Sequence, residues 1–179
     1  MKRLAAAALA LSLVAAPAYA ALKVGVTAPD FTTTSFKGGQ ASPFKLSTAL
    51  KKGPVVLYFF PSAYTSGCTV EAHEFAVATP EFAAMGASVV GVTAGRVEDL
   101  AKFSKEECRD AFPVAGVTKE TIKAYDAVLA FKPTLSDRVT YVIAPDGKIL
   151  LAYTALTDPV SHIAKAKEAV TAWRRTHPK

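Results

Sequence analysis

Cys68 is one of two cysteines in the 179-residue chain, and it stands in the stretch FFPSAYTSGCTVEAHEF, residues 59–75. Pro61 ends an apolar run, Thr65 comes three residues before the cysteine, and Gly67 directly precedes it. We expect a helix to begin here, with Cys68 in the first turn, where unpaired backbone N–H groups and the helix dipole favour an anion. Thiols at helix N-termini are commonly more acidic than a free thiol. Cys68 is therefore either a thiolate nucleophile or a small buried packing residue.

Strand and helix patterns alternate along the rest of the chain. Dense apolar runs predict strands at 54–60, 87–94 and 112–117, with two more within 138–156 around a turn at 145–147. Helical patterns occupy 67–85, with an interruption expected near Pro80, and also 96–111, 119–130 and 160–175. The sequence of residues 21–40 predicts short extended segments that can pair as a hairpin. The sequence of residues 44–53 predicts a short helical turn.

This order predicts an α/β fold, a central mixed sheet flanked by helices on both faces and ending in an antiparallel hairpin. Thioredoxin-like domains have this plan, and so do other small α/β domains. The functional crevice of such a sheet lies at the carboxyl ends of its strands. Because Pro61 ends the first buried strand, the loop that leads to Cys68 is expected at that edge.

The first twenty residues have the pattern of a secretory signal peptide. Lys2 and Arg3 precede a short apolar run, and Ala18-Tyr19-Ala20 is a small-x-small cleavage site. The run is shorter than the about 20 residues of a bilayer span, although retention as a helical anchor stays the alternative. We expect cleavage after Ala20, one domain at 21–179, export to the periplasm and no membrane span afterwards. Thiols there are oxidised unless something keeps them reduced.

The charge and the histidines exclude other classes of function. The net charge of +6 is spread along the chain apart from the basic tail RRTHPK, without the aromatic-interleaved basic stripe of nucleic-acid binders. His73, His162 and His177 have no metal-ligand spacing with each other or with Cys68. We therefore expect no nucleic-acid partner, no metal and no cofactor.

PSAYTSGC, residues 61–68, resembles the P-x-x-x-T-x-x-C signature of the peroxiredoxins. The stretch PSAYTSGCTVEAHEF is similar to the bacterioferritin-comigratory, or Q-type, branch of that family. GVTAPDFTTTSFKG, GASVVGVTAGRVEDLAKFSKE and DRVTYVIAPDGKI resemble other segments of the branch, so that the resemblance covers nearly the whole mature chain. It implies a thioredoxin-like fold and a thiol-dependent peroxidase that reduces hydrogen peroxide and organic hydroperoxides.

The resemblance also implies roles for single residues. Cys68 would be the peroxidatic cysteine, which peroxide oxidises to a sulfenic acid. Thr65 would exchange hydrogen bonds with thiolate and peroxide, and Arg138 would stabilise the thiolate and the leaving oxygen. Pro61 would shape and shield the pocket, and backbone N–H groups at Gly67 and Cys68 would complete the anion site.

Three of these residues have a second interpretation. Thr65 could be a helix N-cap and nothing more, and Arg138 could be an ordinary surface cation. Glu71 lies one turn after Cys68 on the same helix face. It either orients Arg138 by ion pairing or is a first-turn acid favoured by the helix dipole.

A sulfenic acid needs a second thiol. Many Q-type members carry the resolving cysteine five residues after the peroxidatic one, where this chain has His73. Others place it in the next helix, and Cys108 in FSKEECRDAF is the candidate there. Since a disulfide needs Cα atoms about 4.4–6.8 Å apart, we expect local unwinding on oxidation. Alternatively Cys108 is buried packing, and an external thiol resolves Cys68.

Two other functions remain to be compared with the peroxidase. A thiol–disulfide oxidoreductase normally carries C-x-x-C, whereas this chain reads Cys68-Thr69-Val70-Glu71. A non-enzymatic domain would join Cys68 and Cys108 in a structural disulfide. For the peroxidase we expect a monomer with a peroxide substrate and a reductant that is a thioredoxin-like protein or a low-molecular-weight thiol.

Overall fold

The structure is a computed structural model that describes residues 21–178, so the proposed signal peptide, residues 1–20, lies outside the described part. Seven strands are present: β1 (Thr32–Lys37), β2 (Gln40–Lys45), β3 (Val55–Phe59), β4 (Ser88–Thr93), β5 (Val114–Gly116), β6 (Val139–Ile143) and β7 (Ile149–Thr154). The helices are α1 (Leu46–Leu50), α2 (Ser66–Ala84), the 3₁₀ turn η1 (Val97–Asp99), α3 (Leu100–Glu106), α4 (Lys119–Ala124) and α5 (Ser161–Thr176).

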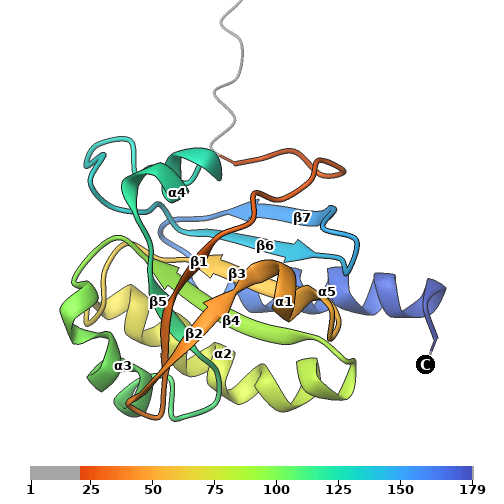
Figure 1. Cartoon of the computed structure of the whole chain (residues 1–179), viewed down its shortest axis with the longest axis horizontal. Helices are drawn as coiled ribbons and strands as arrows, with labels where there is room; N and C mark the ends of the chain where they lie inside the picture. The colour runs from red at the N-terminus through yellow and green to blue at the C-terminus, as the bar shows by residue number, and fades with distance from the viewer. Residues whose placement is uncertain (1–20, 179) are drawn as a thin grey trace, which may run out of the picture.

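The strands form one mixed sheet in the order β2-β1-β5-β4-β3-β6-β7. β3 pairs in parallel with β4, and β4 with β5, whereas β6 runs antiparallel to both β3 and β7. The arrowheads of β3 and β4 point toward the side of the molecule where α2 begins and α3 lies (Figure 1). The loop from β3 into α2 therefore lies at the carboxyl edge of the parallel strands, as the sequence predicts.

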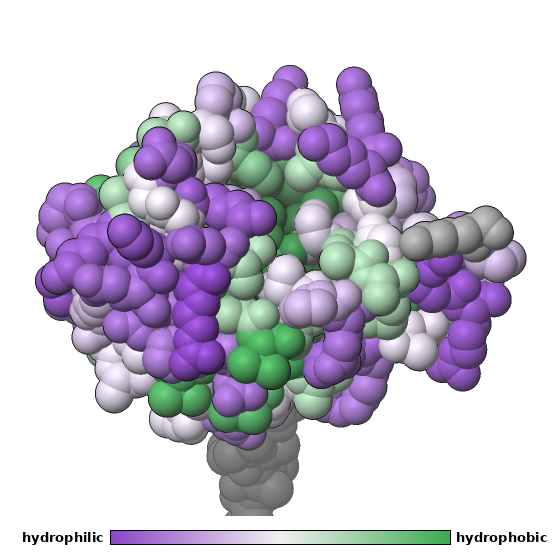
Figure 2. Space-filling view, turned by 90° about the horizontal axis from the view of Figure 1, so that it is seen from below, coloured by the Kyte–Doolittle hydropathy of each residue, from purple (hydrophilic) through white to green (hydrophobic). Residues whose placement is uncertain are grey.

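Helices cover both faces of this sheet because β3 is apolar on both of its faces. Val56 and Tyr58 pack into a core cluster with residues of α2, α3 and α5. Val55, Leu57 and Phe59 point the other way, into a second cluster with residues of α1 and α4. The predicted sheet with helices on both faces is confirmed. Seen from below the view of Figure 1, hydrophilic residues cover most of the surface, and hydrophobic ones gather in a narrower central region (Figure 2).

Three predicted helix details were wrong. α2 continues without a break through Pro80, because buried Phe75, Ala78 and Phe82 hold the helix against the core on both sides of it. This packing outweighs the local cost of about 3 kcal/mol of a proline inside a helix. The predicted helix 119–130 ends at Ala124, and Asp126 has a positive φ of 48°.

The predicted helix 96–111 is a 3₁₀ turn followed by the seven-residue α3, which ends before Cys108. Arg109 and Asp110, with φ angles of 50° and 57°, leave helical geometry. The N–H of Cys108 donates to the carbonyl of Phe103, five residues back instead of the four of an α-helix, and the N–H of Asp110 donates to the carbonyl of Ser104. Cys108 thus stands in the turn after α3 and not inside a helix. Among the helices of residues 21–178, none is both long and apolar enough to cross a membrane.

Candidate active site

Cys68 is the third residue of α2, and its side chain is buried, with 1% of its surface exposed. A terminal nitrogen of Arg138, Nη2, lies 3.6 Å from its Sγ. These residues meet because β3 leads into α2 and β6 pairs with β3, so that Phe59 at the end of β3 lies opposite Val139, the residue after Arg138. The arrangement brings a permanent cation to a buried thiol from a position 70 residues away in the chain.

Thr65 lies at the N-cap position of α2, but its side chain makes no capping bond. Its hydroxyl donates instead to the carbonyl of Ser62 at 3.2 Å, and its own carbonyl accepts the N–H of Thr69. The interpretation of Thr65 as a side-chain cap was therefore wrong. Pro61 begins this loop, and its carbonyl accepts a hydrogen bond from the hydroxyl of Thr93 on β4.

Gly67 gives Arg138 room to approach Cys68. A Cβ atom at this position would lie 2.9 Å from Nη2 of Arg138, the same nitrogen that contacts the Cys68 sulfur. Any larger residue would have to displace the guanidinium.

Arg138 is buried, with 4% of its surface exposed, so the surface-cation interpretation was wrong. Three of its nitrogens are used by three different partners. Nη2 faces Cys68, Nη1 pairs with Glu71, and Nε donates to the carbonyl of Leu156 at 3.0 Å. The guanidinium plane is thereby fixed, and only a planar, forked group could make all three contacts.

Glu71 is fully buried and forms the ion pair with Arg138, which supports the orienting interpretation. It is not a first-turn acid, because the first turn of α2 has no acidic residue. Its oxygen Oε2 contacts Arg138, whereas Oε1 has no hydrogen-bond partner. Burial raises the pKa of Glu71 from 4.5 to about 8, with Arg138 opposing the shift.

His162 on α5 also belongs to this buried group, a residue that the sequence pattern did not indicate. Its Nδ1 lies 3.8 Å from Oε1 of Glu71 and 2.8 Å from the hydroxyl of Thr140. Its Nε2 lies 3.2 Å from the carbonyl of Ala155; since a carbonyl can only accept, Nε2 carries the proton. Burial lowers the pKa of His162 to about 4, so the ring is neutral and adds no charge near Arg138. A single histidine on an apolar helix stripe gives no signal of this contact.

The protonation of Glu71 predicts a pH dependence of stability. Between pH 4.5 and about 8 the folded state keeps a proton that the unfolded state has released, so the contribution of Glu71 to stability falls as the pH rises through this range. Glu71→Gln mimics the protonated acid and removes this dependence. Urea unfolding from pH 5 to 8.5 should show wild type losing stability relative to Glu71→Gln as the pH rises. An unchanged difference between the two proteins across this range would mean that Glu71 is ionised throughout.

Cys108 is fully buried in the same core cluster as Cys68, and both cysteines are free thiols. Burial, together with the nearby charges of Glu107 and Asp110, raises the pKa of the Cys108 thiol. In this closed arrangement Cys108 is therefore a protonated, shielded thiol and not a nucleophile.

The site supports the chemistry of a buried thiol beside one fixed cation, which a buried acid of raised pKa holds in place. Such a cation stabilises negative charge on the sulfur and on an atom that the sulfur attacks. Within residues 21–178, no group of three or more histidine, cysteine or acidic side chains has the arrangement of a metal site.

Comparisons with known proteins agree with this geometry. A model of the AhpC/TSA family matches residues 24–152. A protein of Mycobacterium tuberculosis named as a peroxiredoxin is 36% identical over 156 residues, 86% of this chain and 99% of its own. Peroxiredoxin Q of Sedum lineare chloroplasts is 31% identical over 81% of this chain and 76% of its own. Peroxiredoxin Bcp of Xanthomonas campestris is 29% identical over 70% of this chain and 78% of its own.

A solved structure gives the same result for the fold. The crystal structure of peroxidoxin BcpB from Mycobacterium tuberculosis superposes with a TM-score of 0.75 at 33% identity, over 84% of this chain and 97% of that one. The family match at residues 24–152 includes the strand β3, the helix α2 that carries the buried thiol, and the strand β6 that its cation directly precedes. The chain therefore belongs to the AhpC/TSA family and is a peroxiredoxin of the Q or Bcp type with a thioredoxin-like fold.

Proposed function

We propose that this protein is a thiol-dependent peroxidase in which Cys68 reduces hydrogen peroxide and small organic hydroperoxides. The Cys68 thiolate attacks one peroxide oxygen, so that an S–O bond forms as the O–O bond breaks. The leaving oxygen takes up a proton and departs as water or an alcohol, and Cys68 becomes a sulfenic acid. Family membership supports the activity, and the contact of Arg138 Nη2 with Cys68 Sγ supports the assignment of the nucleophile.

Each neighbour of Cys68 has a proposed part in this step. Arg138 stabilises the thiolate and the charge that develops on the leaving oxygen. Glu71 and the carbonyl of Leu156 hold Arg138 in place. The Thr65 hydroxyl, which now donates to Ser62, can also accept a hydrogen bond from the peroxide. Gly67 supplies space and, with Cys68, backbone N–H groups that face the substrate.

We propose Cys108 as the resolving cysteine. Its sulfur attacks the sulfenic sulfur of Cys68, the S–S bond forms, and the hydroxyl of the sulfenic acid leaves with the Cys108 proton as water. Both thiols are buried and free, so the attack requires local opening around one or both of them. The termination of α3 before Cys108 makes the Cys108 segment the simpler one to open, since no helix has to unwind there.

The setting of the enzyme is proposed from the sequence. Residues 1–20 are a signal peptide, and the mature domain, residues 21–179, acts as a monomer in the periplasm. A thioredoxin-like protein or a small thiol of that compartment then reduces the disulfide.

The two alternative functions are not favoured. A thiol–disulfide oxidoreductase would need a second cysteine near Cys68 in α2, where Glu71 stands instead. A structural disulfide would join Cys68 and Cys108, whereas both are free in the structure. Relatives of this chain carry the names of peroxiredoxins.

Mass spectrometry of the reduced mature protein tests the proposal. One equivalent of hydrogen peroxide should give a Cys68–Cys108 disulfide in wild type within seconds. Cys108→Ser should accumulate sulfenic acid at Cys68 instead, and Cys68→Ser should leave Cys108 reduced. If Cys68 is oxidised no faster than an ordinary thiol, the proposal fails.

A further inference from the structure

Two contacts connect the residues around Cys68 with the two acids that directly precede Cys108. The Tyr64 hydroxyl donates to Oε2 of Glu106 at 2.8 Å. Nε2 of His73 lies 2.7 Å from Oε2 of Glu107. Tyr64 comes four residues before Cys68 and His73 five residues after it. The segment that carries Cys108 is therefore attached at two successive residues, one to the loop before α2 and one to α2, the helix that carries Cys68.

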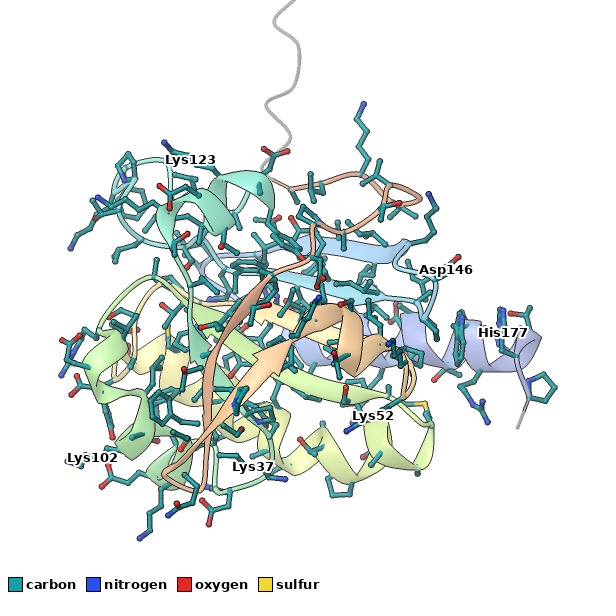
Figure 3. The ribbon with its side chains drawn as sticks, in the orientation of Figure 1. Lys37, Lys52, Lys102, Lys123, Asp146 and His177 are labelled. Atoms are coloured by element: carbon teal, nitrogen blue, oxygen red, sulfur yellow. The ribbon has the colours of Figure 1, made fainter. Side chains whose placement is uncertain are left out.

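The Tyr64 side of this connection is supported by further packing. The Tyr64 ring contacts the Phe103 ring edge-on at 5.3 Å, and the cations of Arg96 and Lys102 lie 5.6 and 5.8 Å from its centre. Lys102 also lies 3.8 Å from the other oxygen of Glu106, but both partners of this contact are largely exposed. Lys102 marks the side of α3 that faces solvent, on the opposite side of the molecule from Asp146 (Figure 3).

The segment after these acids is held in an unfavourable conformation. Arg109 and Asp110 have positive φ angles, and so does Tyr64, at 60°. Left-handed geometry is strained for residues that have a Cβ atom, and more so for Arg109 than for an aspartate. The hydroxyl of Tyr58, in the core cluster that contains both cysteines, has no hydrogen-bond partner. Opening of the Cys108 turn would relieve the strain at Arg109 and Asp110, so the closed form depends on contacts elsewhere.

We propose that the Tyr64–Glu106 and His73–Glu107 contacts form a latch that keeps Cys108 closed and sets the rate at which Cys108 resolves the Cys68 sulfenic acid. This inference rests on the proposed function and specifies its second step. Tyr64 and His73 act through the position of Cys108 and do not touch the reacting atoms. Breaking the latch makes opening easier, and the disulfide then forms faster.

A consequence of the latch is control over further oxidation. While Cys108 stays closed, the Cys68 sulfenic acid is exposed for longer to a second peroxide, which oxidises it to the sulfinic acid with loss of water or alcohol. A weakened latch shortens this time. Latch variants should therefore be more resistant to inactivation by excess peroxide than wild type.

The test uses rapid quenching and mass spectrometry of the reduced mature protein after hydrogen peroxide is added. The variants are Tyr64→Phe, which keeps the ring contacts, His73→Gln and Glu107→Gln. Glu168→Gln is the matched control, because Glu168 is an exposed acid paired with Lys165 at 3.0 Å on α5. Each latch variant should form the disulfide about three- to thirtyfold faster, the factor expected for one partly exposed charge-assisted contact. The control should not differ from wild type, and the oxidation rate of Cys68 itself should stay within about twofold.

Two further measurements separate a latch from a general loosening of the fold. The double variant His73→Gln/Glu107→Gln should be no faster than either single variant, because both changes break the same contact. Hydrogen exchange of the reduced variants should speed up at residues 106–112 and not in β3 or β6.

The outcomes keep the two proposals apart. If Cys68 reacts rapidly with peroxide in every variant but disulfide formation is unchanged or slower, the latch is wrong and the peroxidase proposal stands. If Cys68 of wild type is not oxidised rapidly, the proposed function fails, and the latch with it. Additive effects of His73→Gln and Glu107→Gln would also contradict the latch, since the two residues would then act separately.

Discussion

Cys68→Ser is expected to lower the rate of peroxide reduction by a factor of about 10³ or more. A serine hydroxyl does not ionise near neutral pH, so Arg138 has no anion to stabilise and the peroxide meets no nucleophile. The side chain is buried and of similar size, so the fold should tolerate the change. Peroxide consumption with dithiothreitol as the reductant, followed over minutes, measures the effect.

Cys108→Ser is the matched control for this variant, because Cys108 is equally buried in the same core cluster. It should keep the rapid first reaction with peroxide and lose only the disulfide. If Cys68→Ser retains more than about a tenth of the wild-type rate, or if Cys108→Ser loses the first reaction, Cys68 is not the nucleophile.

Arg138→Lys is expected to slow the oxidation of Cys68 by about 10²–10³-fold, the usual loss for removing a group that stabilises developing negative charge. Lysine keeps the positive charge but has one nitrogen. It cannot face Cys68, pair with Glu71 and donate to Leu156 together, as the three guanidinium nitrogens of Arg138 do. Stopped-flow measurement of Cys68 oxidation by hydrogen peroxide gives the rate.

The role of Arg138 in stability can be separated from its role in catalysis. Arg138→Met leaves Glu71 buried without its cation and should cost about 3–5 kcal/mol of unfolding free energy above pH 8, where Glu71 of wild type is ionised, and less below it. Arg138→Met/Glu71→Gln should recover most of the stability and none of the rate. A double variant that recovers the rate as well would show that Arg138 acts through the fold alone.

The sequence by itself determined the local parts of this structure. The apolar run before Pro61 predicts the buried strand β3, and the loop and helix after it place Cys68 in the first turn of α2. The turn at 145–147 and the apolar residues around it predict the β6–β7 hairpin. These features depend on neighbours within a few residues, which the sequence shows directly. The motif from Pro61 to Cys68, with Arg138 far downstream, was enough to identify the family.

Only the tertiary structure decided how the site is built. Whether Arg138 is a surface cation or a buried partner of Cys68 depends on β6 pairing with β3, a contact between segments far apart in the chain. The role of Glu71 also depends on tertiary contacts, because only its pairing with Arg138 distinguishes an orienting residue from a first-turn acid. His162 is near Glu71 only because α5 packs beside it.

The position of Cys108 shows the limit of periodic patterns. The apolar residues of 96–111 fit a helix, yet the chain leaves helical geometry at Arg109 and Asp110. Burial of Cys108 and Phe112 in the core on either side of that turn balances the strain of two left-handed residues. The helix propensity of residues 96–111 does not show this balance. The packing energy comes from contacts of Cys108 and Phe112 with side chains of β3 and α2, which are distant in the sequence.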